Sequence, residues 1–330
     1  MKNSRSQALV QIEKIKNRVL AGEDLTYDEA IFLMNIKDEE ELLEGLFNAS
    51  REVKEKYNKH EVSLCSIISG KVGSCSEDCK FCAQSAHYST EVETKPLPTY
   101  EQIKRAAEET ESSGVKRFSI VSSGKGLDGK DLEDVIAYYN RLSEDTDLHL
   151  CASLGILSEE ALEKLSRSGV QMYHHNLESG RDYYEKICST HSYDERIETI
   201  KLAKKLGMKV CCGGIIGMGE SAKDRADFMF QLKELKVDAV PLNILDPIKG
   251  TPLENLGRMS KTEILKTIAV FRLALPEAEL RYAGGRKHLD DKQKLGIEMA
   301  INGMLVGNFL TTVGNSIEED MAMISDYTIV

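Results

Sequence analysis

Three cysteines of this sequence lie in one short segment. The segment reads Gly70-Lys-Val-Gly-Ser-Cys75-Ser-Glu-Asp-Cys79-Lys-Phe-Cys82, which has the spacing Cys-x3-Cys-x2-Cys. Three thiolates confined to one loop suit an iron–sulfur cluster, and because a cubane has four irons to ligate, three cysteines leave one iron open. An open iron is what a cluster needs when a small molecule must bind it directly. The segment therefore predicts a 4Fe-4S cluster with a free coordination site.

A structural zinc site is the alternative for the same cysteines. Such a site takes four Cys or His ligands. His87 is the only nearby candidate for the fourth ligand, and the cysteine spacing is unusual for zinc. Detection of iron in the purified protein separates the two interpretations.

The segment also carries an aromatic residue, Phe81, directly before its last cysteine. With this residue it resembles the signature of the radical S-adenosylmethionine superfamily. The resemblance implies that S-adenosylmethionine chelates the open iron through its amino and carboxylate groups, with Phe81 beside the cofactor. Electron transfer into the sulfonium would then release methionine and a 5'-deoxyadenosyl radical.

The elements that must position this loop alternate along the chain. From Val62 onward, short apolar runs alternate with helical patterns, and eight runs are predicted as strands: residues 63–69, 117–122, 148–153, 171–178, 208–213, 239–245, 279–283 and 304–309. Ser/Thr-x-x-Glu/Gln boxes such as Thr99 with Gln102 mark helix starts. Glycines 114, 169, 207 and 303 are expected where helices stop. Eight β-then-α units predict the α/β class and a (β/α)8 TIM barrel over residues 61–330, after an N-terminal helical extension over residues 1–60. An open doubly wound sheet is the alternative.

Strand alternation assigns several polar side chains to the barrel interior, because successive side chains point to opposite faces. In residues 148–153 the apolar set faces the helices, which sends Cys151 inward; the same test sends Cys211 inward and Cys212 outward. Cys65, in the first strand, is expected to be an ordinary core residue. The other residues predicted to face inward are His149, Ser153, Ser119, His174, Asn176, Glu178, Asn243 and Arg281.

Several segments of the chain resemble segments of the biotin synthases. The matching segments are 75–82, Tyr173-His-His-Asn-Leu-Glu178, Cys211-Cys-Gly-Gly-Ile-Ile-Gly-Met-Gly-Glu220, Val240-Pro-Leu-Asn243 and Lys249-Gly-Thr-Pro-Leu253. The resemblance implies a homodimer of eight-stranded barrels that inserts sulfur between two unactivated carbons of dethiobiotin. It also implies two molecules of S-adenosylmethionine per biotin and a second, sacrificial iron–sulfur cluster as the sulfur source.

The family's second cluster is a 2Fe-2S cluster held by three cysteines and one arginine, which map onto Ser119, Cys151, Cys211 and Arg281. Ser119 departs from this pattern, because a serine oxygen is a poorer ligand for cluster iron than a thiolate. Cys188, between the fourth strand and its helix, is one candidate replacement. The hypothesis is that Cys151, Cys188 and Cys211 hold a 4Fe cluster whose open iron carries an extra sulfide; the alternative is that Cys188 is an ordinary loop thiol.

The resemblance assigns roles to other interior residues. Asn176 and Glu178 match positions that contact S-adenosylmethionine, although a structural salt bridge is the alternative for Glu178. Asn243 matches a substrate contact, and a buried asparagine that satisfies backbone groups is the alternative. His174 stands at a position of substrate or cofactor contact where asparagine is common. Arg281 is predicted to ligate the second cluster, pair with a carboxylate or hydrogen-bond sulfide.

The overall composition fits small-molecule chemistry. The formal net charge is −11 over 330 residues, which argues against a nucleic-acid surface. No apolar run is long enough for a membrane span, and eight cysteines without an export signal indicate a cytoplasmic protein. The expected partners are dethiobiotin, a flavodoxin- or ferredoxin-type electron donor and cluster assembly proteins. The alternative functions are a related barrel enzyme of radical rearrangement or cofactor maturation, and an electron or cluster carrier.

Overall fold

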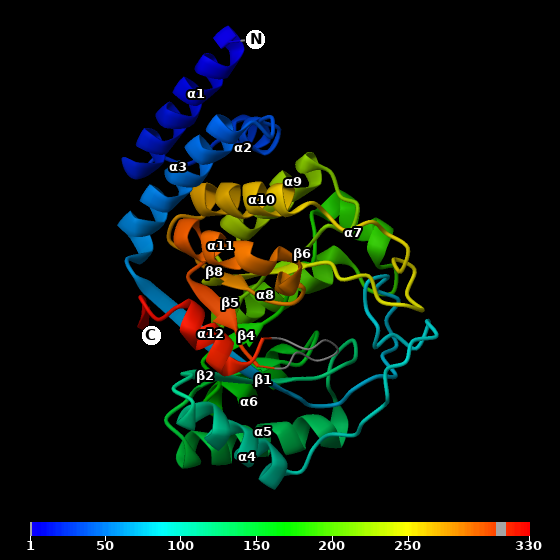
Figure 1. Cartoon of the computed structure of the whole chain (residues 1–330). Coiled ribbons are helices and arrows are strands. Elements are labelled where there is room, and N and C mark those ends of the chain that lie inside the picture. Colours follow the sequence, from blue (N-terminus) through cyan, green and yellow to red (C-terminus); the bar gives the residue numbers. More distant parts are fainter. Residues whose placement is uncertain (1, 308–314) are drawn as a thin grey trace.

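The computed structural model describes residues 2–307 and 315–330, with side chains from residue 5 onward. At its centre eight parallel strands form a closed ring (Figure 1). In ring order they are β1 (Glu61–Ser69), β2 (Arg117–Val121), β3 (His149–Ser153), β4 (Met172–His174), β5 (Lys209–Cys211), β7 (Ala239–Ile244), β8 (Glu279–Tyr282) and β9 (Gly303–Leu305). β1 pairs with both β2 and β9, which closes the sheet. The prediction of a (β/α)8 barrel is confirmed, and the open sheet is excluded.

Two short strands accompany the ring. β6 (Gly214–Ile216) pairs with β7 just after β5 ends, and β10 (Thr328–Ile329) pairs with the start of β1. The predicted strand 304–309 corresponds to β9, and its residues from 308 onward lie outside the described residues.

Two details of the sequence-based prediction are wrong. Gly303 does not end a helix, since α11 ends at Met299 and Gly303 begins β9. A Cβ at Gly303 would lie 2.5 Å from Arg281 Cγ, so glycine is needed there to admit the arginine. The predicted strand 171–178 ends at His174, because beyond it the chain crosses to the next strand, where the amides of Leu177 and Glu178 donate to Gly213 O.

Helices surround the ring. They are α4 (Tyr100–Ser112), α5 (Gly129–Asp145), α6 (Glu159–Arg167), α7 (Arg181–Ile187), α8 (Tyr193–Lys205), α9 (Ala222–Glu234), α10 (Lys261–Ala274), η1 (Arg286–Lys292), α11 (Gln293–Met299) and α12 (Ile317–Met323). The capping box predicted at Thr99 is present, and a second one begins α8 at Ser192. The main core lies between these helices and the outward-facing strand residues, such as Leu64, Phe118 and Val210. The inner face of the sheet thereby carries most of the polar and sulfur-bearing side chains of the strands, together with a few apolar ones such as Leu305.

Three helices precede the first strand: α1 (Lys2–Leu20), α2 (Tyr27–Met34) and α3 (Glu40–Asn58). They lie together on the side of the barrel covered by α9, α10 and α11 (Figure 1). Ser50 Oγ donates to Met299 O at 2.8 Å, which ties α3 to α11. The domain boundary at residue 60 stays a prediction. None of the described helices combines the length and apolar character needed to cross a membrane.

Candidate active site and metal centres

The loop after β1 carries Cys75, Cys79 and Cys82, here called the mouth triad, to the end of the barrel where the parallel strands terminate. Backbone hydrogen bonds fold the loop on itself: Cys75 N donates to Gln84 O at 3.0 Å, and Cys82 N donates to Cys79 O at 2.9 Å. All three cysteines line one cavity of about 320 Å³. Cys75 and Cys79 are nearly buried, whereas Cys82 is partly exposed. The triad therefore faces a cavity that small molecules can enter on the side of Cys82.

Two acidic residues inside the triad fasten the loop to the segment that follows α7. The Asp78 carboxylate accepts from the Ser189 and Thr190 amides at 2.8 and 3.2 Å. Glu77 Oε2 lies 2.5 Å from His191 Nδ1, and both side chains are buried. The loop is thus held by charge-assisted hydrogen bonds.

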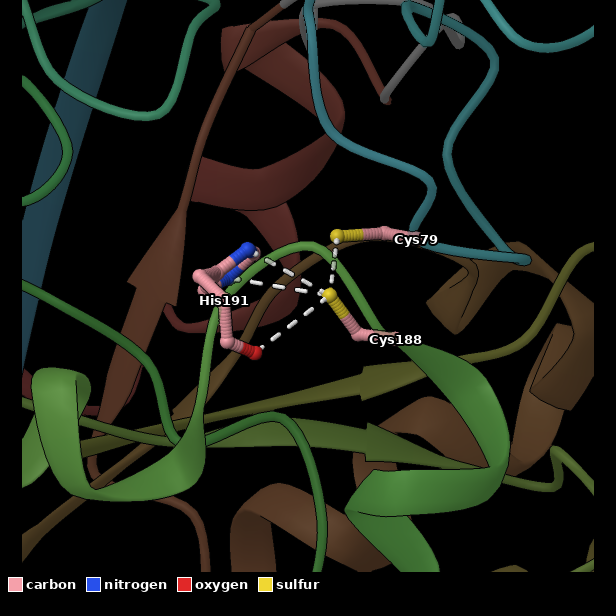
Figure 2. Close-up of side chains that lie close together, drawn as sticks. All are labelled: Cys79, Cys188 and His191. Carbon is pink, nitrogen blue, oxygen red and sulfur yellow. Dashed lines mark hydrogen bonds between the residues drawn. The ribbon is translucent and has the colours of Figure 1, made fainter.

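This attachment places Cys188 directly against the mouth triad. Its sulfur lies 3.6 Å from Cys79 Sγ and 3.3 Å from His191 Nδ1 (Figure 2). The Cys79–Cys188 hydrogen bond lowers the pKa of Cys188 and raises the pKa of Cys79, so the pair shares a proton. Within the described residues, the ligand atoms of Cys79, Cys188 and His191 are all within 4.8 Å of one another. His87, the candidate for a fourth zinc ligand, instead lies 2.9 Å from Ser76 O through Nε2.

A strained turn after β4 presents two polar side chains to the same cavity. Glu178 has φ 69°, a left-handed conformation that is costly for a residue with a side chain. A Cβ at Gly214 would lie 2.4 Å from Glu178 O, so this glycine lets β6 approach the turn. Asn176 Oδ1 accepts from Gly213 N at 3.1 Å, and Arg196 donates to Asn176 O at 2.8 Å. Burial raises the pKa of Glu178, and the charge of Arg196 opposes that shift.

The inward-facing residues of the strands can be ordered by height from the pairing register. Strands of an eight-stranded barrel are tilted, so paired residues on neighbouring strands do not lie at the same height along the barrel axis. The residue at equal height lies about one position further along the next strand than the paired residue. From Cys65, the pairing runs across to Arg117 and then to His149. On β3, two strands after β1, the residue at the height of Cys65 therefore lies two positions beyond His149. That residue is Cys151.

The same step, from one residue to the residue at equal height two strands further on, can be repeated around the whole barrel and returns to Cys65. It leads from Cys151 to Cys211, from Cys211 to Arg281, and from Arg281 back to Cys65. The intermediate pairs are Met172 with Lys209, Ala239 with Glu279, and Gly303 with Ser63. Cys65, Cys151, Cys211 and Arg281 thus form one layer from alternate strands, called here the lumen ring. By the same steps, the layer nearer the mouth contains Ser119, His174, Pro241 and Leu305.

The lumen ring is buried and positively charged on one side. Burial raises the pKa of Cys211 to about 12 and also raises those of Cys65 and Cys151, while the Arg281 charge acts in the opposite sense on all three thiols. Arg281 donates to Ser63 Oγ at 2.9 Å and pairs with Glu279, but its Nε has no partner. Three thiols beside a buried donor without a partner form a donor set that fits an iron–sulfur cluster.

Ser119 and His174 lie in the layer nearer the mouth. Ser119 is fully buried, and its Oγ has no hydrogen-bond partner. Burial lowers the pKa of His174 to about 3, with the Arg281 charge adding to the shift, so the imidazole is neutral. Asn243 donates to Gly214 O at 3.1 Å and accepts from Gly284 N at 2.9 Å. Asn243 therefore satisfies backbone groups while also lining the cavity.

Most residues singled out in the sequence lie around one cavity. Its lining includes the mouth triad, Phe81, His174, Asn176, Glu178, Cys211, Asn243 and Arg281. Cys151 packs beside Cys211 with Met172 and Ala239, whereas Cys188 belongs to the main core cluster with Cys79.

Four residues of the site were missed or misread in the sequence. Cys65 is buried as expected, but it lines the cavity instead of the outer core. The alternation of outward-facing Val62 and Leu64 is the signal that would have identified it. Glu77, His191 and Arg196 also line the cavity, and nothing in their spacing marks them, because their roles depend on contacts between distant loops.

Known families and relatives match the chain over most of its length. Residues 72–232 match the family model described as the radical SAM superfamily, and residues 241–329 match the biotin and thiamin synthesis associated domain. A biotin synthase of Acetivibrio thermocellus is 49% identical over 94% of this chain and 96% of its own length. A biotin synthase of Campylobacter hominis is 48% identical over 96% of this chain and 97% of its own.

Solved structures share the fold at low identity. Methylornithine synthase aligns with a TM-score of 0.82 at 22% identity, covering 96% of this chain and 97% of that protein. The [FeFe]-hydrogenase maturase HydG also aligns at 0.82, with 19% identity, covering 98% of this chain and 75% of that protein. These two likenesses concern the barrel fold alone.

Proposed function

The chain belongs to the biotin synthase family, and we propose that it converts dethiobiotin to biotin by radical insertion of sulfur. The family match runs through both halves of the chain. It favours sulfur insertion over radical rearrangement or cofactor maturation, the alternatives left open by the mouth triad. The enzyme thus uses S-adenosylmethionine, a 4Fe-4S cluster and an auxiliary iron–sulfur cluster.

One observation carries this proposal: sulfur ligands lie at both ends of a single cavity. The mouth triad lines its outer end, and Cys65, Cys211 and Arg281 line its inner end. A substrate held between them has a radical source on one side and a sulfur source on the other. An electron carrier or a cluster carrier has no need of such an enclosed space.

Cys75, Cys79 and Cys82 would hold the 4Fe-4S cluster, with S-adenosylmethionine completing its coordination. When bound, the cluster and cofactor supply a 5'-deoxyadenosyl radical. Asn176 and Glu178 are suited to the polar groups of the cofactor, since the strained turn aims them into the cavity. Phe81, partly exposed at the same wall, offers an apolar surface.

His174 and Asn243 would contact dethiobiotin between the two cysteine sites. His174 is neutral, because burial lowers its pKa to about 3. It can therefore donate or accept a hydrogen bond with the uncharged ring of the substrate, without bringing a charge into the cavity. Asn243 keeps its position through its two backbone hydrogen bonds.

Cys151 and Cys211 would hold the auxiliary cluster, with Arg281 as a ligand or as a hydrogen-bond donor to its sulfide. The sequence-based hypothesis adds Cys188 and a 4Fe cluster with an extra sulfide; a 2Fe-2S cluster is the other form. Flavodoxin- or ferredoxin-type proteins would supply electrons, and cluster assembly proteins would rebuild the auxiliary cluster. We further propose a homodimer located in the cytoplasm, where a reducing environment keeps thiols free.

Anaerobic turnover tests the proposal. The reconstituted protein is incubated with S-adenosylmethionine, dethiobiotin and a low-potential reductant, and biotin and 5'-deoxyadenosine are measured by mass spectrometry. Biotin should form while the absorbance of the auxiliary cluster declines. Formation of 5'-deoxyadenosine without biotin, in protein that holds both clusters, would contradict sulfur insertion into dethiobiotin.

A further inference from the structure

We propose that Cys65 is the third thiolate ligand of the auxiliary cluster, acting with Cys151 and Cys211 in the lumen ring. The inference deepens the proposed function and rests on it. It replaces two earlier expectations at once: that Cys65 is an ordinary core residue, and that Cys188 completes the ligand set.

The height of Cys65 in the barrel is the first argument. The register places Cys65, Cys151 and Cys211 on alternate strands at one level, so their side chains converge on the same part of the lumen. Arg281 completes that level on the fourth side. A cluster bound by the first three would then lie beside the guanidinium.

Space around the ring is the second argument. The layer directly below contains Arg117, Met172, Ala239 and Gly303. In the layer directly above, which also contains His174, Pro241 and Leu305, Ser119 stands in place of the cysteine that the family resemblance implies. The small residues Ala239 and Gly303 beside the ring, and the cavity of about 320 Å³ that Cys65, Cys211 and Arg281 line, leave room for inorganic sulfide and iron between the thiols. Ser119 Oγ and Arg281 Nε, both buried without a partner, are donors available to such a group.

The position of Cys188 is the third argument. Its sulfur is already engaged by Cys79 at 3.6 Å and His191 at 3.3 Å (Figure 2). Its neighbours belong to the mouth, whereas Cys151 and Cys211 pack in a separate cluster with Met172 and Ala239. Drawing Cys188 into the lumen would require breaking the contacts that fasten the triad loop.

Charge balance is the fourth argument. Binding iron removes protons from the three thiols, because only thiolates ligate the metal. Arg281 lies at the same level of the lumen as Cys65, Cys151 and Cys211, and its side chain is buried there. A buried cation among three thiolates offsets the cost of burying that negative charge.

The experiment compares iron and acid-labile sulfide in four anaerobically reconstituted full-length proteins: the natural chain, Cys65→Ala, Cys188→Ala and Cys212→Ala. Cys212 is the matched control, because it is as deeply buried but faces the outer core. Mössbauer spectra report the cluster type, and thermal denaturation reports folding. We expect the natural chain to hold about six or eight irons. Cys65→Ala should retain about four irons, while the other two variants match the natural chain.

A rescue variant guards against simple misfolding. Cys65→Ala combined with Ser119→Cys returns a thiol to the neighbouring layer, and we expect it to recover at least part of the lost iron. Retention of both clusters in Cys65→Ala, or loss of the auxiliary cluster in Cys188→Ala, would overturn the inference. If the natural chain itself held only about four irons, the result would contradict the presence of an auxiliary cluster, and with it the proposed function, and not only the role of Cys65.

Discussion

The mouth triad and the lumen ring both collect three cysteines, but by different means. The triad lies in eight consecutive residues of one loop, whereas the ring takes one thiol from each of three strands. The loop is fastened by side-chain contacts to the segment after α7 and leaves Cys82 partly exposed. The ring is fixed by backbone pairing and is at most 3% exposed at its cysteines. A site that exchanges a small molecule is thus built on a loop, and a site that must stay closed is built on the sheet.

Removing one ligand from the triad should have the largest effect on activity. Cys79→Ala should abolish cleavage of S-adenosylmethionine, because the cubane loses one of its three protein ligands. The lumen ring does not touch Cys79, so the auxiliary iron should remain. Formation of 5'-deoxyadenosine and iron content measure the two outcomes. Loss of all iron in a folded Cys79→Ala protein would show that the two sites are not independent.

Thiol alkylation of the metal-free chain compares the accessibility of the two sites. Burial raises the pKa of Cys82 to about 11 and that of Cys211 to about 12. Only the thiolate reacts, so the rate at Cys82 should still rise about tenfold between about pH 9 and 10, where an ordinary thiol has levelled off. Cys82 should react first, and Cys211 should wait for the barrel to open. Mass spectrometry of the modified peptides tests this order, with Cys212 as the buried control; equal rates at Cys82 and Cys211 would mean an open lumen.

Removing the cation from the lumen ring should lower both iron content and stability. Arg281→Met leaves the ring without positive charge and removes one partner of Glu279, which keeps its 2.9 Å pair with Arg117. Because Glu279 is not left alone, we expect a loss of about 2 kcal/mol, less than the about 3–5 kcal/mol for a fully orphaned buried charge. Denaturation of the metal-free protein measures the free energy of unfolding, and iron analysis measures the cluster.

Arg281→Lys is the matched control, because it keeps the charge but not the fork of donors. It should retain more of the auxiliary iron than Arg281→Met. Equal iron in Arg281→Met and the natural chain would show that the guanidinium neither ligates nor balances the cluster.

Local sequence was sufficient for the triad but not for the ring. The Cys-x3-Cys-x2-Cys spacing brings its thiols together whatever the rest of the chain does, and the eight strand patterns identify the barrel. Cys151 and Cys211 could be assigned inward from alternation in their own strands. Cys65 was missed, because Ser66 at an outward position and Ile67 at an inward one obscure the alternation that Val62 and Leu64 begin in β1. Its height relative to Cys151 depends on strand register, which no short segment of sequence encodes.

The contacts around Cys188 were beyond prediction for a different reason. Its place beside Cys79 follows from Asp78 and Glu77 reaching the Ser189 amide and His191. Such pairs join residues more than a hundred positions apart, and ordinary loop composition gives no sign of them. The sequence indicated only that Cys188 follows the fourth strand, and this position does not say which of the two cysteine sites Cys188 lies beside.

The smallest expected effect is a shift in the reduction potential of the mouth cluster when Cys188 is replaced, and it tests whether Cys188 acts at the mouth triad or at the lumen ring. When Cys79 binds iron it has no proton, so Cys188, 3.6 Å away, becomes the hydrogen-bond donor of the pair. A donor to a cluster thiolate favours the reduced, more negative state. Cys188→Ala should therefore lower the reduction potential of the mouth cluster by about 40 mV, the equivalent of a hydrogen bond of about 1 kcal/mol for one electron. Cys188→Ser keeps a donor and should shift the potential less. Redox titration followed by electron paramagnetic resonance measures the shift. An unchanged potential together with loss of auxiliary iron would assign Cys188 to the lumen, because only a ligand of that cluster would produce this combination.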